Sequence, residues 1–444
     1  MTMPAYTRAM LSRGLLFVSC MVGAIAHADG QIRTVSLSDA LRQADVNVPA
    51  LRVAQAQSEV SQAQANEVRA PLLPQLNGTA TYQRTTSNYI QRPGAIPNTI
   101  VVTNSSSGGT FNYFNFGLTL SQTLFDGPTF ARWRAAIGNL EATRIAEATA
   151  RLDAALNVRV AFFNAKATLA LAEVARETLA NQKRHLDQVK GFVEVGTRPE
   201  IDLAQAKTDV ANAQVALINS DNNFQVAKAT LNQAMGIESD TNYEVGEGTA
   251  LPVDVEDAEI GEQAELAKHA RPELAVFDKQ LRAQALTIQA NKLGYAPTAA
   301  AQTQVSAGGV QLDNLGWNWN LQIGLTWNLF GGMLTYSQVK EAEAQLKVLV
   351  AQRDVALLQI RLELEKGRLA VRAAKATLLA ANDALENARI LKTLAEGRYR
   401  AGVGNAIELS DAVLALANAG GQQVQAEFNV AAARAQLLRA LGRR

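Results

Sequence analysis

Residues 317–329, which read WNWNLQIGLTWNL, decide the fold. Apolar and aromatic residues alternate with neutral polar residues, and the stretch has no charge. A period of two is the spacing of a β-strand whose two faces meet different surroundings. Residues 114–124, FNFGLTLSQTL, follow the same rule apart from Gln122.

Each of these strands is preceded by a partner strand with a weaker alternation, at residues 76–83 and 298–307. The turn-rich residues 84–112 separate the first pair, and a shorter loop, 308–316, separates the second. Uncharged strands that are apolar on one face and aromatic at their ends are typical of transmembrane β-structure. An edge hairpin on a soluble sheet is the alternative. The membrane interpretation predicts an aromatic girdle of Phe114, Phe116, Trp317, Trp319 and Trp327.

Long helices make up most of the remaining chain. Residues 129–194 and 334–400 contain no proline, and each predicts a rod on the order of 100 Å. From Leu203 to Leu231, residues that are apolar or small recur at alternating steps of three and four. The same seam recurs from Leu409 to Leu437, with Gln423 polar. Such a seam predicts helix-on-helix packing along the rods.

The chain contains an internal repeat. Residues 196–236 align with 402–442 without a gap, and 13 of 41 positions are identical. We interpret this as a tandem duplication, which is the first organisation to test in a long chain. The expected units are residues 29–236 and 263–444. Between them, residues 237–262 form an acidic linker without Lys or Arg, expected to lie beside the rods.

The N-terminus predicts export. Arg8 and Arg13 precede an apolar stretch, and Ala26-His27-Ala28 is a small-x-small cleavage pattern, so residues 1–28 are expected to be a signal peptide. A lipoprotein signal ending at Cys20 is the rival interpretation. No later stretch is apolar enough for a membrane helix.

Composition excludes several classes of function. The chain has 42 Lys+Arg against 41 Asp+Glu, which disfavours nucleic-acid binding. One Cys and three His argue against thiol catalysis and metal sites. His185 and His269 each lie in a polar helical stretch without a second histidine nearby. We therefore expect no catalytic residue, no metal and no cofactor, and the protein is not expected to be an enzyme.

Four membrane strands per chain cannot form a closed sheet. In lipid every backbone N–H and C=O must be paired, and about eight strands is the lower limit for a barrel. The chain must therefore associate. Three chains give twelve strands, but two or four chains would also allow closure.

The order of several short segments resembles the TolC-type outer-membrane efflux protein family. These segments are Asn47–Leu51, Pro71–Pro74, Leu124–Gly127, Val195–Arg198 and Arg271–Leu274. The resemblance implies a mainly α-helical protomer with a membrane β-barrel. It also implies a homotrimer with a shared 12-stranded barrel in the outer membrane of a Gram-negative bacterium, continuous with a 12-helix α-barrel in the periplasm.

The same resemblance implies a function and partners. Family members conduct substrates passively for efflux or secretion, while an inner-membrane transporter supplies energy through a periplasmic adaptor. Outer-membrane lipid would surround the barrel. The cargo is not indicated by the sequence.

The resemblance also places candidate sites at the helix hairpins. The adaptor would dock around Gly196, Thr197, Arg198, Gly402 and Gly404, although helix capping alone explains the two hairpin glycines, Gly196 and Gly402.

Acidic residues follow each turn. Asp202, Glu408 and Asp411 would form an acidic pore entrance that favours cations. Stabilisation of the first helical turn is the alternative role for these acids. Arg198 matches the family's arginine that ties neighbouring hairpins shut. In the family this arginine lies in the second copy, where this chain has Gly404, so Arg398 and Arg400 are alternative donors.

Two rivals remain open from sequence. A periplasmic coiled-coil scaffold without a pore would not need the uncharged aromatic strands. An exported enzyme would need a pocket with clustered titratable groups, which alanine-rich seams do not offer.

Overall fold

A computed structural model describes residues 33–86, 110–238, 242–249 and 251–444. The expected signal peptide with Cys20, and most of the turn-rich stretch 84–112, lie outside these ranges. None of the helices in the described ranges has the length and apolar character required to cross a lipid bilayer.

The same order of elements occurs twice along the chain. The first series is β1 (Arg33–Val35), α1 (Leu37–Asn47), α2 (Pro49–Arg69), η1 (Ala70–Leu72), β2 (Gln75–Thr86), β3 (Thr110–Phe125), α3 (Gly127–Glu194) and α4 (Glu200–Met235). The second is β4 (Tyr243–Val245), α5 (Ile260–Ala270), α6 (Pro272–Lys292), η2 (Leu293–Tyr295), β5 (Thr298–Gln311), β6 (Asn314–Thr326), α7 (Leu334–Arg400) and α8 (Ala406–Ala440).

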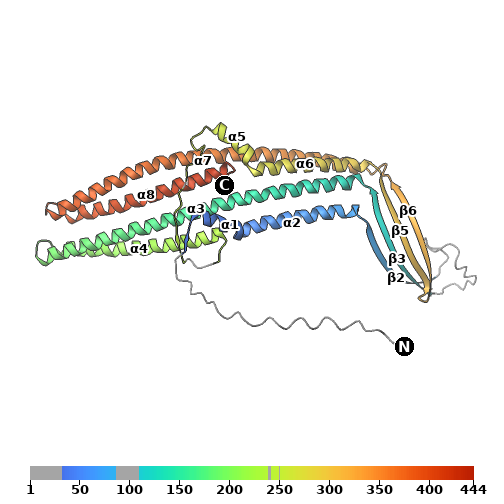
Figure 1. Ribbon diagram of the computed structural model, residues 1–444, viewed down its shortest axis with the longest axis horizontal. Helices are drawn as coiled ribbons and strands as arrows, with labels where there is room; N and C mark the ends of the chain where they lie inside the picture. Colours follow the sequence, from blue (N-terminus) through green and yellow to red (C-terminus); the bar gives the residue numbers. More distant parts are fainter. Residues whose placement is uncertain (1–32, 87–109, 239–241, 250) are drawn as a thin grey trace, which may run out of the picture.

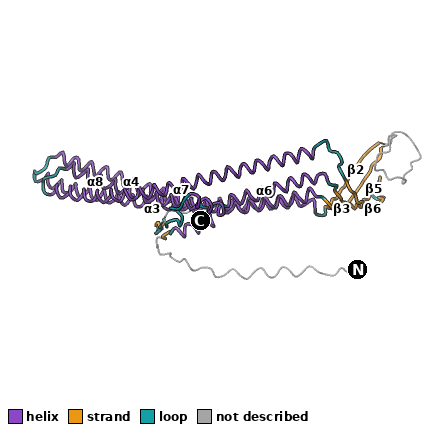
Figure 2. Tube along the Cα trace, turned by 90° about the horizontal axis from the view of Figure 1, so that it is seen from above, coloured by secondary structure: helices purple, strands orange, loops and turns teal. Residues whose placement is uncertain are grey.

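The chain forms a bundle of long helices with a sheet at one end and two hairpin turns at the other (Figures 1 and 2). Helices α3 and α7 have 68 and 67 residues, so each is about 100 Å long. Helices α4 and α8 run back from the turns, while α2 and α6 cover the half nearer the sheet. The arrangement places the strands and the turns at opposite ends of the molecule.

The seams predicted for α4 and α8 are confirmed by burial. Every seam position from Leu203 to Leu231 is buried or half-buried, and so is every seam position from Leu409 to Leu437. Small residues at alternate positions, such as Ala206 and Ala412, are 2% exposed. Because these side chains are short, α4 and α8 approach α3 and α7 closely.

The four long strands form one antiparallel sheet in the order β2-β3-β5-β6. The register aligns one row across it: Ala80, Phe116, Ala307 and Trp317. Apolar residues thus share a face across all four strands, as the alternation predicted.

Two details of the predicted strands are wrong. The loop 308–316 is mostly strand, because β5 continues to Gln311 and pairs there with Asn314 of β6. At the other end, β6 stops at Thr326, which pairs with the first residue of β5, Thr298. Trp327 lies beyond this last pair and so has no opposite residue in the ladder.

The middle of the bundle carries a core where the two series of elements meet. Strands β1 and β4 pair in parallel beside buried residues such as Phe162 and Leu231. Gly236 and Gly442 end α4 and α8 with φ angles of 71° and 72°. A Cβ at either glycine would lie 2.7–2.8 Å from the backbone of the α1–α2 or α5–α6 junction. The bundle therefore closes equivalently on both short helix pairs.

Ion pairs connect the linker and both halves in this region. Arg439 of α8 contacts Asp153 of α3 at 2.8 Å and Glu363 of α7 at 3.0 Å. Glu256 of the acidic segment receives Arg434 at 2.9 Å and Lys375 at 2.6 Å. Burial opposes ionisation of Glu256, but these hydrogen bonds outweigh it and lower its pKa to about 2.

Candidate functional site

The two hairpin turns share one backbone geometry. Gly196 and Gly402 adopt φ angles of 74° and 75°, the left-handed conformation that ends a helix. The next residue, Thr197 or Val403, donates its N–H to the carbonyl five residues back, at 2.9 and 3.1 Å. A Cβ at either glycine would meet nothing within 4 Å. The tips are therefore capped by their own backbone and open to contact.

Large apolar side chains are exposed around these turns. They are Val195 and Ile201 at the first turn (72% and 73%), and Val403 and Ile407 at the second (71% and 65%). Both turns therefore expose large apolar side chains of the kind that protein partners cover.

Arg198 joins the two turns. Its guanidinium donates to the carbonyl oxygen of Gly404 at 3.0 Å and lies 4.9 Å from the ring centre of Tyr399. Gly404 is buried in this contact. The other three tip residues, Gly196, Thr197 and Gly402, are exposed. The structure thus places the arginine of the first hairpin on the second hairpin of the same chain.

Tyr399 and His185 form a buried contact that the sequence reasoning missed. Tyr399 is 1% exposed, and its ring lies 5.2 Å from that of His185 in an edge-on arrangement. Burial raises the pKa of the Tyr399 hydroxyl and lowers the pKa of His185. His185 lies in the helical stretch predicted for it, and its side chain packs against Tyr399 of α7. No local motif could have signalled a contact between residues so far apart in the chain.

The three candidate acids differ in their surroundings. Asp202 is half-buried, whereas Glu408 and Asp411 are exposed. The backbone N–H of Glu408 donates to the side chain of Asn405 at 2.7 Å, so Glu408 lies in a capped first turn. Its carboxylate also pairs with Arg398 at 3.0 Å.

The alternative arginines have separate partners. Arg398 neutralises part of the negative charge that Glu408 brings to the tip. Arg400 instead pairs with Glu396, one turn earlier on α7. Neither of these ion pairs connects the two hairpins, whereas the hydrogen bond from Arg198 to Gly404 does.

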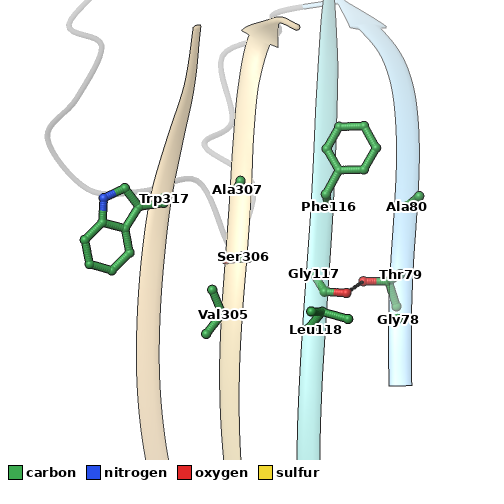
Figure 3. Close-up of a pocket in the computed structure, with 10 residues that line it drawn as sticks. All are labelled: Gly78, Thr79, Ala80, Phe116, Gly117, Leu118, Val305, Ser306, Ala307 and Trp317. Carbon is green, nitrogen blue, oxygen red and sulfur yellow. Dashed lines mark hydrogen bonds between the residues drawn. The ribbon is translucent and has the colours of Figure 1, made fainter. Parts of the chain in front are cut away.

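The expected aromatic girdle lies on the apolar side of the sheet. Phe116, Trp317 and Trp319 are 42%, 79% and 57% exposed, and Phe114 packs on Tyr82 with ring centres 5.1 Å apart. Figure 3 shows Phe116 and Trp317 at either side of Ala307. All three residues line a hollow of about 440 Å³.

Trp327 lies apart from this group, at the end of the sheet where the helices begin. Its indole N–H donates to the carbonyl oxygen of Tyr295 at 2.9 Å. An exposed ring with one satisfied polar atom fits a boundary between apolar and polar surroundings. The aromatic residues therefore lie near both ends of the sheet.

The sequence is similar to a family of known outer membrane proteins over most of its length. The chain matches the family described as "Outer membrane efflux protein" over residues 40–237 and 264–443. It is 26% identical to the pyoverdine export outer membrane protein OpmQ of Pseudomonas putida, covering 88% of this chain and 82% of that protein. It is also 26% identical to the outer membrane protein TolC of Escherichia coli, covering 92% and 82%.

Solved structures show the same fold. The structure of CusC has a TM-score of 0.79 at 18% identity, with 93% of each chain covered. The CmeC outer membrane channel of Campylobacter jejuni has a TM-score of 0.77 at 18% identity, covering 91% of this chain and 85% of that one.

Proposed function

The chain belongs to the outer membrane efflux protein family, and on that premise we propose that three copies form a channel. This channel spans the outer membrane and continues through the periplasm. The signal peptide (1–28), two duplicated units (29–236 and 263–444) and the acidic linker (237–262) remain the proposed organisation of the precursor.

The open, apolar sheet carries the proposal. Strands β3, β5 and β6 contain no charged residue, and Ile323 and Leu325 are 71% and 70% exposed. Within the described residues, the outer edges of β2 and β6 have no strand beside them. Because an unpaired edge is unfavourable in lipid, β6 of one copy would pair with β2 of the next. Three copies would supply a 12-stranded barrel surrounded by outer-membrane lipid.

The helices support the same assembly. Exposed apolar side chains such as Val215 of α4 and Val355, Leu358 and Leu379 of α7 are 58–70% exposed in the single chain. Neighbouring copies would cover them and complete a 12-helix barrel. In this assembly the hairpin tips would lie at the periplasmic end, far from the membrane.

We assign the tips to an adaptor and to gating. The exposed apolar residues and open glycines of the turns would receive a periplasmic adaptor, which links the channel to an inner-membrane transporter. Conduction would be passive. Separation of the hairpins would break the Arg198–Gly404 contact and widen the entrance, where Asp202, Glu408 and Asp411 would set cation preference.

Purified protein in a planar bilayer tests the channel. We expect a detergent-requiring trimer that resists dissociation until heated, and discrete conductance steps. A water-soluble species without conductance would favour a periplasmic scaffold and overturn the proposal.

The acidic entrance requires a separate test with changes of opposite sign. Glu408→Ala with Asp411→Ala should lower cation selectivity, whereas Arg398→Ala should raise it by releasing Glu408 from its ion pair. Unchanged selectivity in both variants would remove these acids from the entrance while leaving the channel itself intact.

A further inference from the structure

A small polar cavity of about 110 Å³ lies between the two helical hairpins, close to the tips. Its wall is formed by α3 on one side and by α7 and α8 on the other. The residues that matter here are Arg184 and His185 of α3, and Lys392, Glu396 and Arg400 of α7. The cavity therefore bridges the same two hairpins that Arg198 connects at the tip.

Positive charge is in excess around this cavity. The Glu396 carboxylate accepts from Lys392 at 2.7 Å and also pairs with Arg400, so one anion serves two cations. The hydrogen bond from Lys392 is the main cause that lowers the pKa of Glu396. Arg184 adds a third cation, and its guanidinium donates to the neutral side-chain oxygen of Asn181.

A buried histidine supplies the second observation. His185 lines the cavity, is 8% exposed, and its Nδ1 atom has no hydrogen-bond partner among the described residues. Leaving a buried polar atom unpaired costs free energy, and a bound water or ion is one way in which native proteins satisfy such an atom. An imidazole whose Nδ1 atom lacks a partner would gain by donating to an anion in the cavity.

We propose that this cavity binds one small oxyanion, such as inorganic phosphate or a short carboxylate, per chain. The guanidinium groups of Arg184 and Arg400 match the paired oxygens of an oxyanion, and Lys392 contributes a point charge. A volume of about 110 Å³ excludes nucleotides and drug-sized molecules. The bound ion would hold α3 against α7.

Binding itself does not require that the protein conducts. The effect of the bound ion on conduction rests on the proposed function, because an ion that binds both hairpins would favour the closed entrance. Direct binding and conductance are therefore measured separately, and each can fail without the other.

Calorimetry of the full-length protein in detergent tests the site. Inorganic phosphate is titrated at constant ionic strength against a chloride background, with one saturable site per chain expected. Arg184→Gln should weaken binding by about tenfold or more, since it removes a charge-assisted bond. Glu396→Gln should strengthen binding, since it removes the competing carboxylate.

Matched controls separate a site from general surface charge. Arg176→Gln lies on the same helix α3, where Arg176 pairs with Asp221 at 3.2 Å, and should leave the affinity unchanged. Glu386→Gln, which removes another carboxylate of α7, is the control for Glu396→Gln and should likewise leave the affinity unchanged. Circular dichroism and the oligomeric state verify folding of each variant. Absence of saturable binding by folded wild type, or equal losses in Arg184→Gln and Arg176→Gln, would overturn the proposal.

Discussion

The guanidinium of Arg198 donates a 3.0 Å hydrogen bond to the carbonyl oxygen of Gly404, its counterpart 206 residues later. This offset is the one that aligns residues 196–236 with 402–442, so the contact joins equivalent positions of the two hairpins. The arginine also covers the buried ring of Tyr399. The two turns share one backbone geometry, but at this position they differ: the arginine of the first turn binds the glycine of the second.

Replacing Arg198 by alanine is expected to loosen the hairpins. A charge-assisted hydrogen bond and a cation–π contact are lost, so the open population should rise by about tenfold. Single-channel recordings measure the open probability. Arg176→Ala, which removes an exposed ion pair within one hairpin, is the control. Equal open probabilities in the two variants would contradict a closing role for Arg198.

The pH dependence of the tips should follow His185. Burial lowers its pKa below the ordinary value of 6.5, so the closed tip takes up a proton less readily than an opened one. Closure should therefore weaken as the pH falls through about 6.5, although the carboxylates of Asp202 and Asp209 partly oppose this. Hydrogen exchange of the tip amides, corrected for intrinsic rates, measures the effect.

A titration-free variant gives the check on this prediction. His185→Phe keeps an aromatic edge against Tyr399 and should remove the pH dependence, while His269→Phe, which changes an exposed residue, should retain it. Persistence of the same pH dependence in His185→Phe would assign it to the nearby carboxylates.

Elements with a regular repeat of apolar residues could be predicted from the sequence, whereas irregular strand ends could not. The bounds of α7, 334–400, follow from an unbroken helical pattern and match the structure. The extension of β5 and β6 was missed because glycines hide the alternation near Gly308, which pairs with Gly316.

Contacts between distant elements leave no local pattern. The packing of His185 on Tyr399 depends on how α3 and α7 are rotated about their axes, and that rotation is set by the whole seam. The roles of the tip acids depend likewise on neighbouring copies, so they stay predictions.

Glu256 is expected to stabilise, at neutral pH, the contact of the acidic linker with α7 and α8. Its pKa is lowered from 4.5 to about 2, which corresponds to on the order of 3 kcal/mol. This contribution is present above pH 4.5 and is lost as the pH falls towards about 2. Denaturant unfolding should therefore show a large loss for Glu256→Gln at pH 7 and a smaller one at pH 3. Asp257→Asn, at a side chain that is 78% exposed, should change little at either pH.

Two glycines separate backbone strain from steric contact. Gly196 and Gly236 have φ angles of 74° and 71°, but only at Gly236 would a Cβ collide, 2.7 Å from the backbone of Asn47. Gly196→Ala should cost roughly 1–2 kcal/mol for the left-handed conformation alone. Gly236→Ala should cost clearly more, because the α1–α2 junction must also move. Equal melting temperatures for the two variants would show that the junction yields freely.

Adjacent residues of β6 offer the sharpest test of which face meets lipid. Ile323 belongs to the apolar face and Gln322 to the polar one, since neighbouring residues in a strand point to opposite sides. An arginine facing the middle of the bilayer costs roughly 2–4 kcal/mol, whereas a barrel interior accepts it. Ile323→Arg should therefore reduce the heat-resistant trimer in outer-membrane fractions, and Gln322→Arg should assemble normally with reduced cation conductance. The reverse pattern would show that the polar face meets lipid. Equal assembly of both variants would show that this strand does not lie in the membrane.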